Sequence, residues 1–236
     1  MKHIDNITTV LFDVGSTLLL PNPPVEEVFT EIAKKRGHAI ELEDVKPHMP
    51  EVDAYYDREY ARNGDFWADP QGSIDIWIGM YDHLCTLIGL ESDSEAISRA
   101  VYEAYAKPQH WTPYDDAIGC LEALRAAGKR MAIVSNWDPA LESIIDGLGL
   151  GCYFETIACS AVVGSRKPDP GIFEYTLERL NVDPREVVHV GDTLEADGEG
   201  ALAVGITPVM IDRENTLPKN FLINLESLLA LPKLVC

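Results

Sequence analysis

The side chains that could do chemistry gather in four short segments, each placed where an apolar run ends. In chain order these segments carry Asp13, Ser135 with Asn136, Lys167, and Asp192 with Asp197. A carboxylate can attack a phosphoryl group and form an aspartyl-phosphate, which divides hydrolysis into two easier steps. A lone aspartate after a strand more often caps a turn, but the four segments together favour a phosphate site whose nucleophile is Asp13.

Two of the acids form a candidate magnesium site. Asp13 and Asp192 would give two hard carboxylate oxygens, and the main-chain carbonyl of Gly15 is a candidate third ligand. Bound Mg²⁺ would neutralise charge and polarise the phosphoryl group. We expect Asp197 to orient Lys167 or the metal ligands rather than to bind the metal directly.

Ser135, Asn136 and Lys167 are the candidates for holding the phosphate. A hydroxyl and the N–H groups at a helix start can bind phosphate oxygens, and a lysine is a point cation that neutralises a phosphoryl oxygen or the nucleophile. Ser and Asn are also common helix caps ahead of a proline such as Pro139, and the two roles are compatible. The predicted catalytic group is therefore Asp13, Ser135 and Lys167.

Hydrophobic periodicity predicts the elements that must position these side chains. Short apolar runs predict strands over 8–12, 130–134, 156–158, 187–190 and 207–211. Helices are expected between them, near 115–127, 139–148, 170–180 and 195–204. This alternation predicts an α/β fold with a Rossmann-like parallel sheet and helices on both faces. Because such sheets bind ligands at the carboxyl ends of their strands, the reactive segments should meet at one edge.

The stretch between the first strand and residue 110 has a different pattern. It contains helical periodicity near 25–36, 49–62, 73–89 and 93–106, with no strand between these segments. We therefore predict a core domain over 1–20 and 110–236, interrupted by an all-helical inserted domain over 21–109. The aromatic residues of the insertion are expected mostly in its own core, whereas Trp111 and Trp137 should lie closer to the cleft.

Composition argues against several kinds of partner. The 236 residues include 39 acidic and 19 basic side chains, for a formal net charge of −20. Such an excess repels nucleic-acid backbones and anionic membranes, and no apolar run approaches the roughly 20 residues of a membrane span. The five cysteines form no disulfide or zinc pattern, and no signal-peptide pattern is present. We expect a cytoplasmic protein whose partner is a small phosphorylated molecule, and the oligomeric state stays open.

Together the segments resemble the haloacid dehalogenase-like hydrolase superfamily, over about residues 1–20 and 110–215. The motifs that carry the resemblance are Phe12-Asp13-x-x-x-Thr17-Leu18, Val134-Ser135-Asn136, Gly164-x-x-Lys167-Pro168-Asp169-Pro170-x-x-Phe173, and Gly191-Asp192-x-x-x-x-Asp197-x-x-Gly200-Ala201. The helical insertion is similar to the cap of the subgroup whose cap follows the first motif. Residues 134–138 resemble the phosphatase-type members of that subgroup.

The resemblance implies both a fold and a set of roles. It implies that the first and fourth strands lie side by side, that Asp13 is the nucleophile, and that Mg²⁺ is held by Asp13, Asp192 and the Gly15 carbonyl. The substrate-binding residues expected from it are Thr17, Ser135, Asn136 and Lys167. Closure of the cap over the site would exclude water and select the substrate.

Gly15 departs from the family pattern. Family phosphatases usually carry a second aspartate there, which protonates the leaving group and later activates water, and such general acid–base catalysis contributes about 10²–10⁴-fold. We therefore expect weak turnover of alkyl phosphates and better turnover of acyl or aryl phosphates, whose leaving groups are already acidic. His110, near the junction of core and insertion, is a candidate replacement for the missing proton donor.

Other functions are compatible with the same residues. A 2-haloacid dehalogenase also lacks the second aspartate and needs no metal, although Gly191-Asp192 resembles the metal-binding form of the fourth motif. A phosphonatase-like hydrolase needs a Schiff-base lysine in the cap, for which the candidates Lys34, Lys35 and Lys46 are more simply explained as solvated charges. A phosphate-binding pseudoenzyme or interaction protein would account for the loss of the acid–base aspartate.

Overall fold

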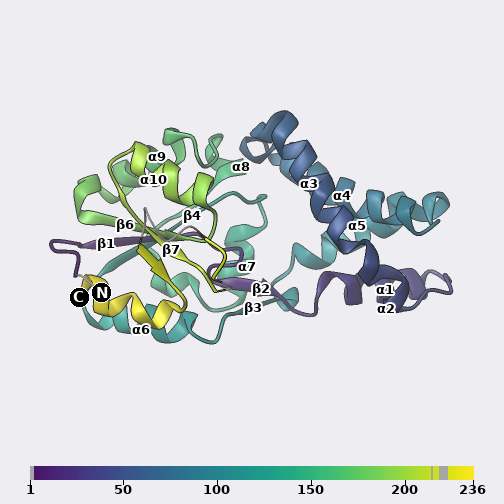
Figure 1. Cartoon of the computed structure of the whole chain (residues 1–236), viewed down its shortest axis with the longest axis horizontal. Coiled ribbons are helices and arrows are strands. Elements are labelled where there is room, and N and C mark those ends of the chain that lie inside the picture. Colours follow the sequence, from purple (N-terminus) through teal and green to yellow (C-terminus); the bar gives the residue numbers. More distant parts are fainter. Residues whose placement is uncertain (1–2, 214, 218–222) are drawn as a thin grey trace.

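The centre of the protein is a six-stranded sheet in which every neighbouring pair of strands runs parallel (Figure 1). The computed structural model describes residues 3–213, 215–217 and 223–236. Across the sheet the strands are β5 (Ile157–Cys159), β4 (Arg130–Ser135), β1 (Thr9–Phe12), β6 (Val187–Gly191), β7 (Thr207–Ile211) and β8 (Ile223–Leu225). The predicted α/β fold is confirmed, and β1 and β6, the first and fourth of the predicted strands, pair directly.

Helices cover both faces of the sheet, as predicted. Successive side chains of a strand point to opposite faces, so Val10 and Phe12 of β1 join one apolar cluster and Leu11 joins another. The helices on the first face are α6 (Ala117–Ala126), α7 (Leu141–Gly147) and α11 (Pro232–Val235). Those on the second face are α9 (Pro170–Leu180) and α10 (Gly200–Ala203). Figure 1 shows α9 and α10 above the sheet and α6 below it.

Three short strands are not predicted by the sequence patterns. The edge strand β8 is only Ile-Asn-Leu, which is too short to show a period of two. The other two strands, β2 (Leu19–Pro21) and β3 (Trp111–Pro113), form a separate antiparallel ribbon. Prolines end both of them, and a proline can lie in such an edge pairing although it cannot lie in a sheet interior.

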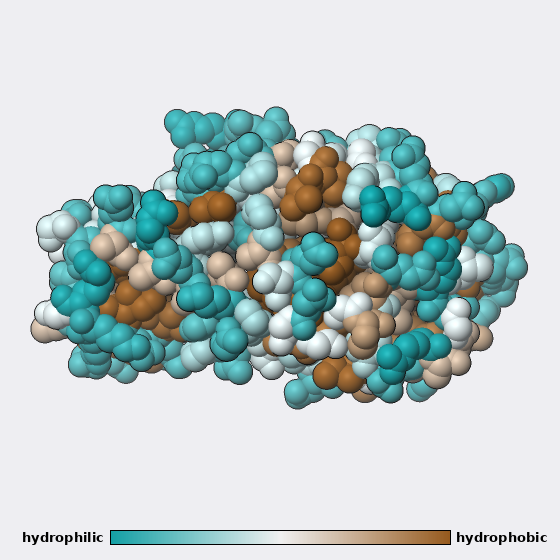
Figure 2. Space-filling view, turned by 180° about the vertical axis from the view of Figure 1, so that it is seen from behind, coloured by the Kyte–Doolittle hydropathy of each residue, from teal (hydrophilic) through white to brown (hydrophobic). Residues whose placement is uncertain are grey.

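Between β2 and β3 the chain forms a helical insertion. Its helices are α1 (Val25–Lys35), α2 (Leu42–Val45), α3 (Met49–Asn63), α4 (Pro70–Leu87) and α5 (Ser94–Tyr105). They bury side chains such as Phe29, Leu84 and Val101 in an apolar cluster distinct from those of the sheet. Seen from behind, hydrophilic side chains cover much of the insertion and apolar ones show in the hollows between them (Figure 2). In the described part of the chain no helix, the 18-residue α4 included, is apolar enough over its length to cross a bilayer.

The insertion contacts the core through the β2–β3 ribbon and through the turn between α3 and α4. This turn, the 3₁₀ helix η2 (Gly64–Ala68), packs against α8 (Ser160–Val163) of the core. Asp69 then starts α4, because its side chain accepts the N–H of Gly72 at 2.6 Å. With both contacts in place, helices of the insertion and the carboxyl ends of β1, β4 and β6 line one cavity.

Candidate active site

Three of the predicted catalytic side chains meet where β1 and β4 end. Asp13 follows β1 directly, and Ser135 is the last residue of the neighbouring strand β4. The Ser135 hydroxyl donates to Oδ1 of Asp13 at 2.9 Å, and Nζ of Lys167 donates to the same oxygen at 2.6 Å. Oδ2 of Asp13 has no hydrogen bond from any described residue. One carboxylate oxygen is therefore fixed by two donors while the other is free to react.

Lys167 lies between two carboxylates in a site from which water is almost excluded. Its ammonium donates to Oδ1 of Asp13 and, at 2.5 Å, to Oδ1 of Asp197, and the side chain is only 2% exposed. Burial alone would lower the pKa of Lys167, but the two carboxylates outweigh burial and raise it above its ordinary value. The lysine is therefore a permanent cation beside Asp13, the predicted nucleophile. Burial is also the main cause that raises the pKa of Asp13, with Lys167 opposing it.

Asp197 contacts Lys167, and the positioning role predicted for it stays a prediction. Besides the lysine, Oδ1 of Asp197 accepts a hydrogen bond from Nε2 of His189 at 2.8 Å, and Oδ2 accepts the N–H of Thr193 at 3.0 Å. His189 is fully buried in β6, and burial lowers its pKa. Burial raises the pKa of Asp197, but Lys167 and His189 outweigh it and hold that pKa well below its usual range. The carboxylate is thus ionised and fully engaged.

The backbone around Asp197 is shaped for this contact. The predicted helix over 195–204 divides into a π-helical turn, η7 (Leu194–Glu199), and the short α10. A wide turn of this kind is common at functional sites. At the end of β6, a Cβ on Gly191 would lie 2.1 Å from Cγ of Asp197, so a side chain at position 191 would displace the carboxylate. The glycine of Gly191-Asp192 is therefore needed for packing rather than for a turn.

Asp13, Asp192 and Asp197 are close enough to share a cation. One carboxylate oxygen from each lies within 4.8 Å of the others. Burial, together with repulsion from the other two acids, raises the pKa of Asp192 to about 7. Closely spaced carboxylate oxygens are suitable ligands for Mg²⁺, and the positive charge of the ion would reduce the repulsion between the carboxylates. The carbonyl of Gly15 accepts the N–H of Thr17 at 2.6 Å, so the metal role predicted for it stays a prediction.

Asn136 and Thr17 make contacts that the sequence did not reveal. The side chain of Asn136 donates to the carbonyl of Lys167 at 2.9 Å and accepts its N–H at 2.8 Å, which anchors the lysine loop to the end of β4. Asn136 also lines the cleft. Thr17 is fully buried and donates to Oδ1 of Asp192 at 3.4 Å. It is not a cleft-lining residue, so its predicted contact with substrate stays a prediction.

Two basic side chains near the junction of core and insertion have clear positions. Arg166 leaves the core and reaches the insertion, where Nη1 donates to the Tyr60 hydroxyl at 3.1 Å and Nε lies 3.3 Å from Oδ1 of Asp65. His110 packs edge-on against Tyr105 and does not line the cleft. The structure therefore gives no support to His110 as a replacement proton donor.

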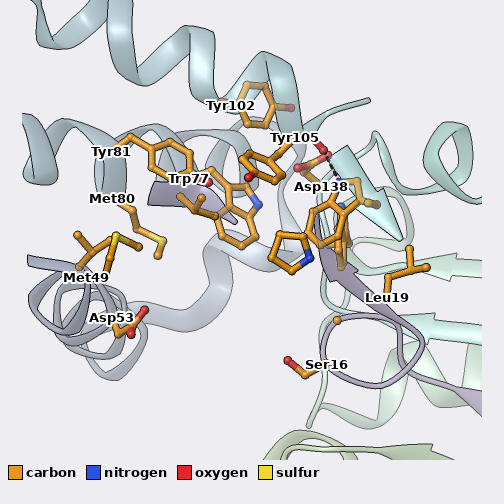
Figure 3. A pocket seen from close by; sticks show the side chains of 16 residues that line it. Ser16, Leu19, Met49, Asp53, Trp77, Met80, Tyr81, Tyr102, Tyr105 and Asp138 are labelled. Atoms are coloured by element: carbon orange, nitrogen blue, oxygen red, sulfur yellow. Dashed lines mark hydrogen bonds between the residues drawn. The ribbon is translucent and has the colours of Figure 1, made fainter. Parts of the chain in front are cut away.

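The cleft above Asp13 opens into a second, aromatic pocket. The cleft has a volume of about 860 Å³, and residues of the insertion such as Tyr56, Tyr60 and Trp67 form its far wall. The aromatic pocket, of about 380 Å³, lies between the insertion and the β2–β3 side of the core (Figure 3). The two cavities share the wall residues Gly15, Ser16, Asp53, Trp77, Met80 and Trp137. The position of Trp137 at the cleft agrees with the sequence-based expectation, whereas nothing in the sequence indicated that Asp53 lines it.

Comparison with known proteins gives a consistent result. A family model described as haloacid dehalogenase-like hydrolase matches residues 7–205. The haloacid dehalogenase-like hydrolase domain-containing protein 3 of Mus musculus is 32% identical over 89% of this chain and 84% of its own length. A ribulose-1,5-bisphosphate 5-phosphatase of Halopiger xanaduensis is 30% identical over 87% of this chain and 84% of its own. The crystal structure of a HAD phosphatase from Thermococcus onnurineus superposes with a TM-score of 0.66, at 29% identity, over 96% of this chain and 97% of that one.

Proposed function

The chain belongs to the haloacid dehalogenase-like hydrolases, and on this basis we propose that it is a Mg²⁺-dependent phosphatase. Its substrate is a small phosphorylated molecule, and the reaction passes through an aspartyl-phosphate on Asp13. The observation that carries the proposal is the asymmetric environment of that carboxylate. Ser135 and Lys167 hold Oδ1, and Oδ2 has no hydrogen bond from the residues that the structure describes.

Each buried side chain has a role in the first step. Oδ2 of Asp13 attacks phosphorus, the bond to the leaving oxygen breaks, and the phosphoryl group becomes bonded to the aspartate. Lys167, held in place by Asp197, supplies a fixed positive charge next to the oxygens that become more negative. Ser135 keeps the carboxylate in position. Water then attacks the acyl phosphate and releases inorganic phosphate, which regenerates Asp13.

The carboxylates of Asp13 and Asp192 would hold Mg²⁺, with the Gly15 carbonyl as the third protein ligand predicted from the sequence. When bound, the ion supplies charge neutralisation and polarisation of the phosphoryl group. Asp197 lies within the same cluster, but its oxygens already accept hydrogen bonds from Lys167, His189 and Thr193. We therefore assign Asp197 to positioning rather than to metal binding.

The absence of a carboxyl group at position 15 sets the range of substrates. Without a general acid the leaving oxygen must depart as an anion, which acyl and aryl phosphates allow far more readily than alkyl phosphates. The relatives named as phosphatases support the reaction type but not a particular substrate. A cytoplasmic location, and the lack of nucleic-acid and membrane partners, remain predictions from composition.

The deciding experiment measures phosphate release from 4-nitrophenyl phosphate. We expect turnover with Mg²⁺, no turnover with EDTA, and none in Asp13→Asn under either condition. Glu174→Gln, at an exposed position on α9, is the matched control and should behave as the wild type. Absence of Mg²⁺-dependent release from the wild-type protein would refute the proposal.

If the wild-type protein shows no Mg²⁺-dependent phosphate release, two further assays distinguish the alternative functions. Metal-independent release of chloride from 2-chloropropionate would identify a dehalogenase. Binding of inorganic phosphate by calorimetry, with no turnover of either compound, would identify a pseudoenzyme.

A further inference from the structure

The aromatic pocket beside the catalytic cleft has a distinctive composition. Its wall is largely ring and thioether surface, contributed by both the insertion and the core. The aromatic residues that line it are Trp77, Tyr81, Tyr102, Tyr105, Trp111 and Trp137. Ring pairs within it are in contact: the centroids of Tyr105 and Trp111 are 5.7 Å apart, and those of Trp111 and Trp137 are 4.8 Å apart. A pocket of this kind accepts an apolar group or the face-on approach of a cation.

The charges on the pocket walls have one sign. The charged residues that line the aromatic pocket are Asp53 and Asp138, both acidic. In the catalytic cleft Lys167 is the one basic residue among the described lining residues, and its ammonium is already paired with Asp13 and Asp197. A leaving group that carried a second phosphate or a carboxylate would find no unpaired basic side chain among the described residues that line the two cavities. A positively charged leaving group in the aromatic pocket would lie near Asp53 and Asp138, both of which attract it.

Asp138 is the clearest sign of what the pocket binds. It is 3% exposed and lines the aromatic pocket. Its Oδ1 accepts the N–H of Ala140 at 2.7 Å, and no described residue donates to Oδ2 or forms an ion pair with the carboxyl group. A buried carboxylate without a cation is costly. Figure 3 places Asp138 beside Tyr105 at one end of the pocket, with Met49 and Met80 at the other.

The aromatic pocket is connected to the reaction centre. Gly15, two residues after the nucleophile Asp13, lies in the wall that the cleft and the pocket share, as does Trp137. Because position 15 has no side chain, nothing from it projects between the two cavities. A phosphate ester whose phosphoryl group lies on Asp13 can therefore place the rest of the molecule among the aromatic rings.

We propose that the aromatic pocket binds the ammonium-bearing leaving group of the substrate, with the cation against Asp138 and the surrounding rings. The substrate class is an aryl phosphate whose leaving group carries a protonated amine. This inference rests on the phosphatase function proposed above. The aromatic rings contribute cation–π attraction, and the free oxygen of Asp138 contributes a charge-assisted hydrogen bond. The reaction is unchanged: the amine-bearing phenol leaves as its oxyanion and takes a proton from water.

The test compares three aryl phosphates whose leaving oxygens are of similar acidity. They are 4-(2-aminoethyl)phenyl phosphate, the neutral 4-propylphenyl phosphate and the anionic 4-(2-carboxyethyl)phenyl phosphate. With Mg²⁺ at about pH 8, where the amine is protonated, we expect kcat/KM for the amine ester to exceed that for the neutral ester about tenfold or more. The anionic ester should be the poorest of the three.

Two variants locate the preference. Asp138→Asn keeps the acceptor for Ala140 but removes the charge, and it should reduce the ratio of kcat/KM for the amine ester over the neutral ester to within about twofold of unity. Glu142→Gln removes the same charge from the exposed surface of α7 and should leave that ratio as in the wild type. Equal rates for the three esters in the wild-type protein would overturn the inference while leaving the phosphatase function intact.

Calorimetry separates the pocket from the chemistry. 2-Phenylethylamine should bind the wild-type protein more tightly than 2-phenylethanol, and Asp138→Asn should abolish the difference. If none of the esters nor 4-nitrophenyl phosphate is hydrolysed, the phosphatase function fails, yet the amine titration still decides whether the pocket recognises ammonium. Indistinguishable binding of the amine and the alcohol would sink the inference.

Discussion

A Cβ atom on Gly15 would lie 3.4 Å from Cζ3 of Trp137, at ordinary van der Waals distance, and, its chain neighbours aside, would meet no other atom of the described residues within 4 Å. The φ angle of Gly15 is not positive, so the backbone conformation at this position does not demand glycine. The glycine is therefore not required by the fold. Glycine at this position has two consequences. The site has no carboxyl group at position 15, and no side chain from this position fills the space beside Trp137 between the cleft and the aromatic pocket.

The first prediction restores the missing carboxyl group. Gly15→Asp should raise kcat for an alkyl phosphate such as phosphoethanolamine by about 10²-fold, because the leaving alkoxide can now be protonated. The rate with 4-nitrophenyl phosphate should change far less, since that leaving group needs no proton. Steady-state kinetics with both compounds measure the two effects in the same preparation.

Gly15→Asn is the control for that variant. It has the same size and the same contact with Trp137 but no acid, so it should not accelerate the alkyl phosphate. Both variants should weaken the preference for the amine-bearing aryl ester, because any side chain at position 15 projects toward the aromatic pocket. Equal rate increases in the two variants would show that the effect is steric and that the acid–base explanation is wrong.

A second prediction concerns the Asp13–Lys167–Asp197 group. Lys167→Met leaves two buried carboxylates without their cation, and breaking a buried pair in this way costs about 3–5 kcal/mol of unfolding free energy. Turnover should fall about 10³-fold or more, since the fixed charge near the phosphoryl oxygens is lost. Urea unfolding and phosphate release measure the two losses.

The double variant Lys167→Met/Asp197→Asn distinguishes the two consequences. Removing the Asp197 charge should restore about half of the lost stability, because one uncompensated carboxylate is gone, while activity stays absent. If the stability losses of the two single substitutions simply add in the double variant, Lys167 and Asp197 are not energetically coupled and the proposed pairing is wrong.

The fold and the positions of the candidate catalytic residues were predictable because they depend on local patterns. A buried run such as 130–134 predicts a strand, and a polar residue at the end of a parallel strand must lie at the edge where ligands bind. That rule is enough to bring Asp13, Ser135 and Asp192 together. The family resemblance added the adjacency of β1 and β6 and the roles of the individual residues.

The remaining features depend on contacts between distant parts of the chain. Asp138 belongs to the segment 134–138 that carries the family resemblance, but that motif does not show that the helical insertion packs above it and makes its carboxyl group part of an aromatic pocket. The exchange of hydrogen bonds between Asn136 and the backbone of Lys167 joins positions 31 residues apart. Neither hydrophobic periodicity nor motif spacing contains such information.

The third prediction tests for the metal through stability. Mg²⁺ that binds the folded protein alone should stabilise it by about 2.7 kcal/mol at 100 times the dissociation constant, and should raise the melting temperature measured by calorimetry. Asp192→Asn should remove most of this increase. Glu178→Gln, at an exposed position on α9, should keep it. If Mg²⁺ raised the melting temperature of all three proteins equally, the ion would bind at a site that does not include Asp192.

The fourth prediction concerns the contact between Arg166 and the insertion. The guanidinium donates to the Tyr60 hydroxyl at 3.1 Å and lies 5.3 Å from the centroid of its ring. Arg166→Gln should raise KM about three- to tenfold with a smaller change in kcat, because the insertion is held less firmly over the cleft. Arg179→Gln removes an equal cation–π contact, to Tyr175 at 5.3 Å, away from the cleft, and should leave KM unchanged. A fall in kcat alone would contradict a role in holding the insertion.

The last prediction is that Asp138 lowers stability at the pH where it is useful. Burial raises the pKa of Asp138 from 3.8 to about 6, and the groups that surround it are neutral tyrosines and the thiol of Cys159, whose own pKa burial raises to about 12. The folded protein therefore binds a proton at Asp138 more tightly than the unfolded chain does. The stability that this proton provides is complete below about pH 4 and is lost as the pH rises through about 6.

Asp138→Asn should accordingly be as stable as the wild type near pH 4 and more stable near pH 8, by about 1–3 kcal/mol of unfolding free energy, since each unit of pKa shift corresponds to about 1.4 kcal/mol. Urea unfolding across this range measures the divergence between the two proteins. A saturating concentration of an amine that pairs with Asp138 should reduce the difference in unfolding free energy near pH 8, because the amine stabilises the wild type alone. A stability difference that is the same at both ends of the range would mean that Asp138 is not a strained, unpaired acid, and the amine site would lose its strongest physical support.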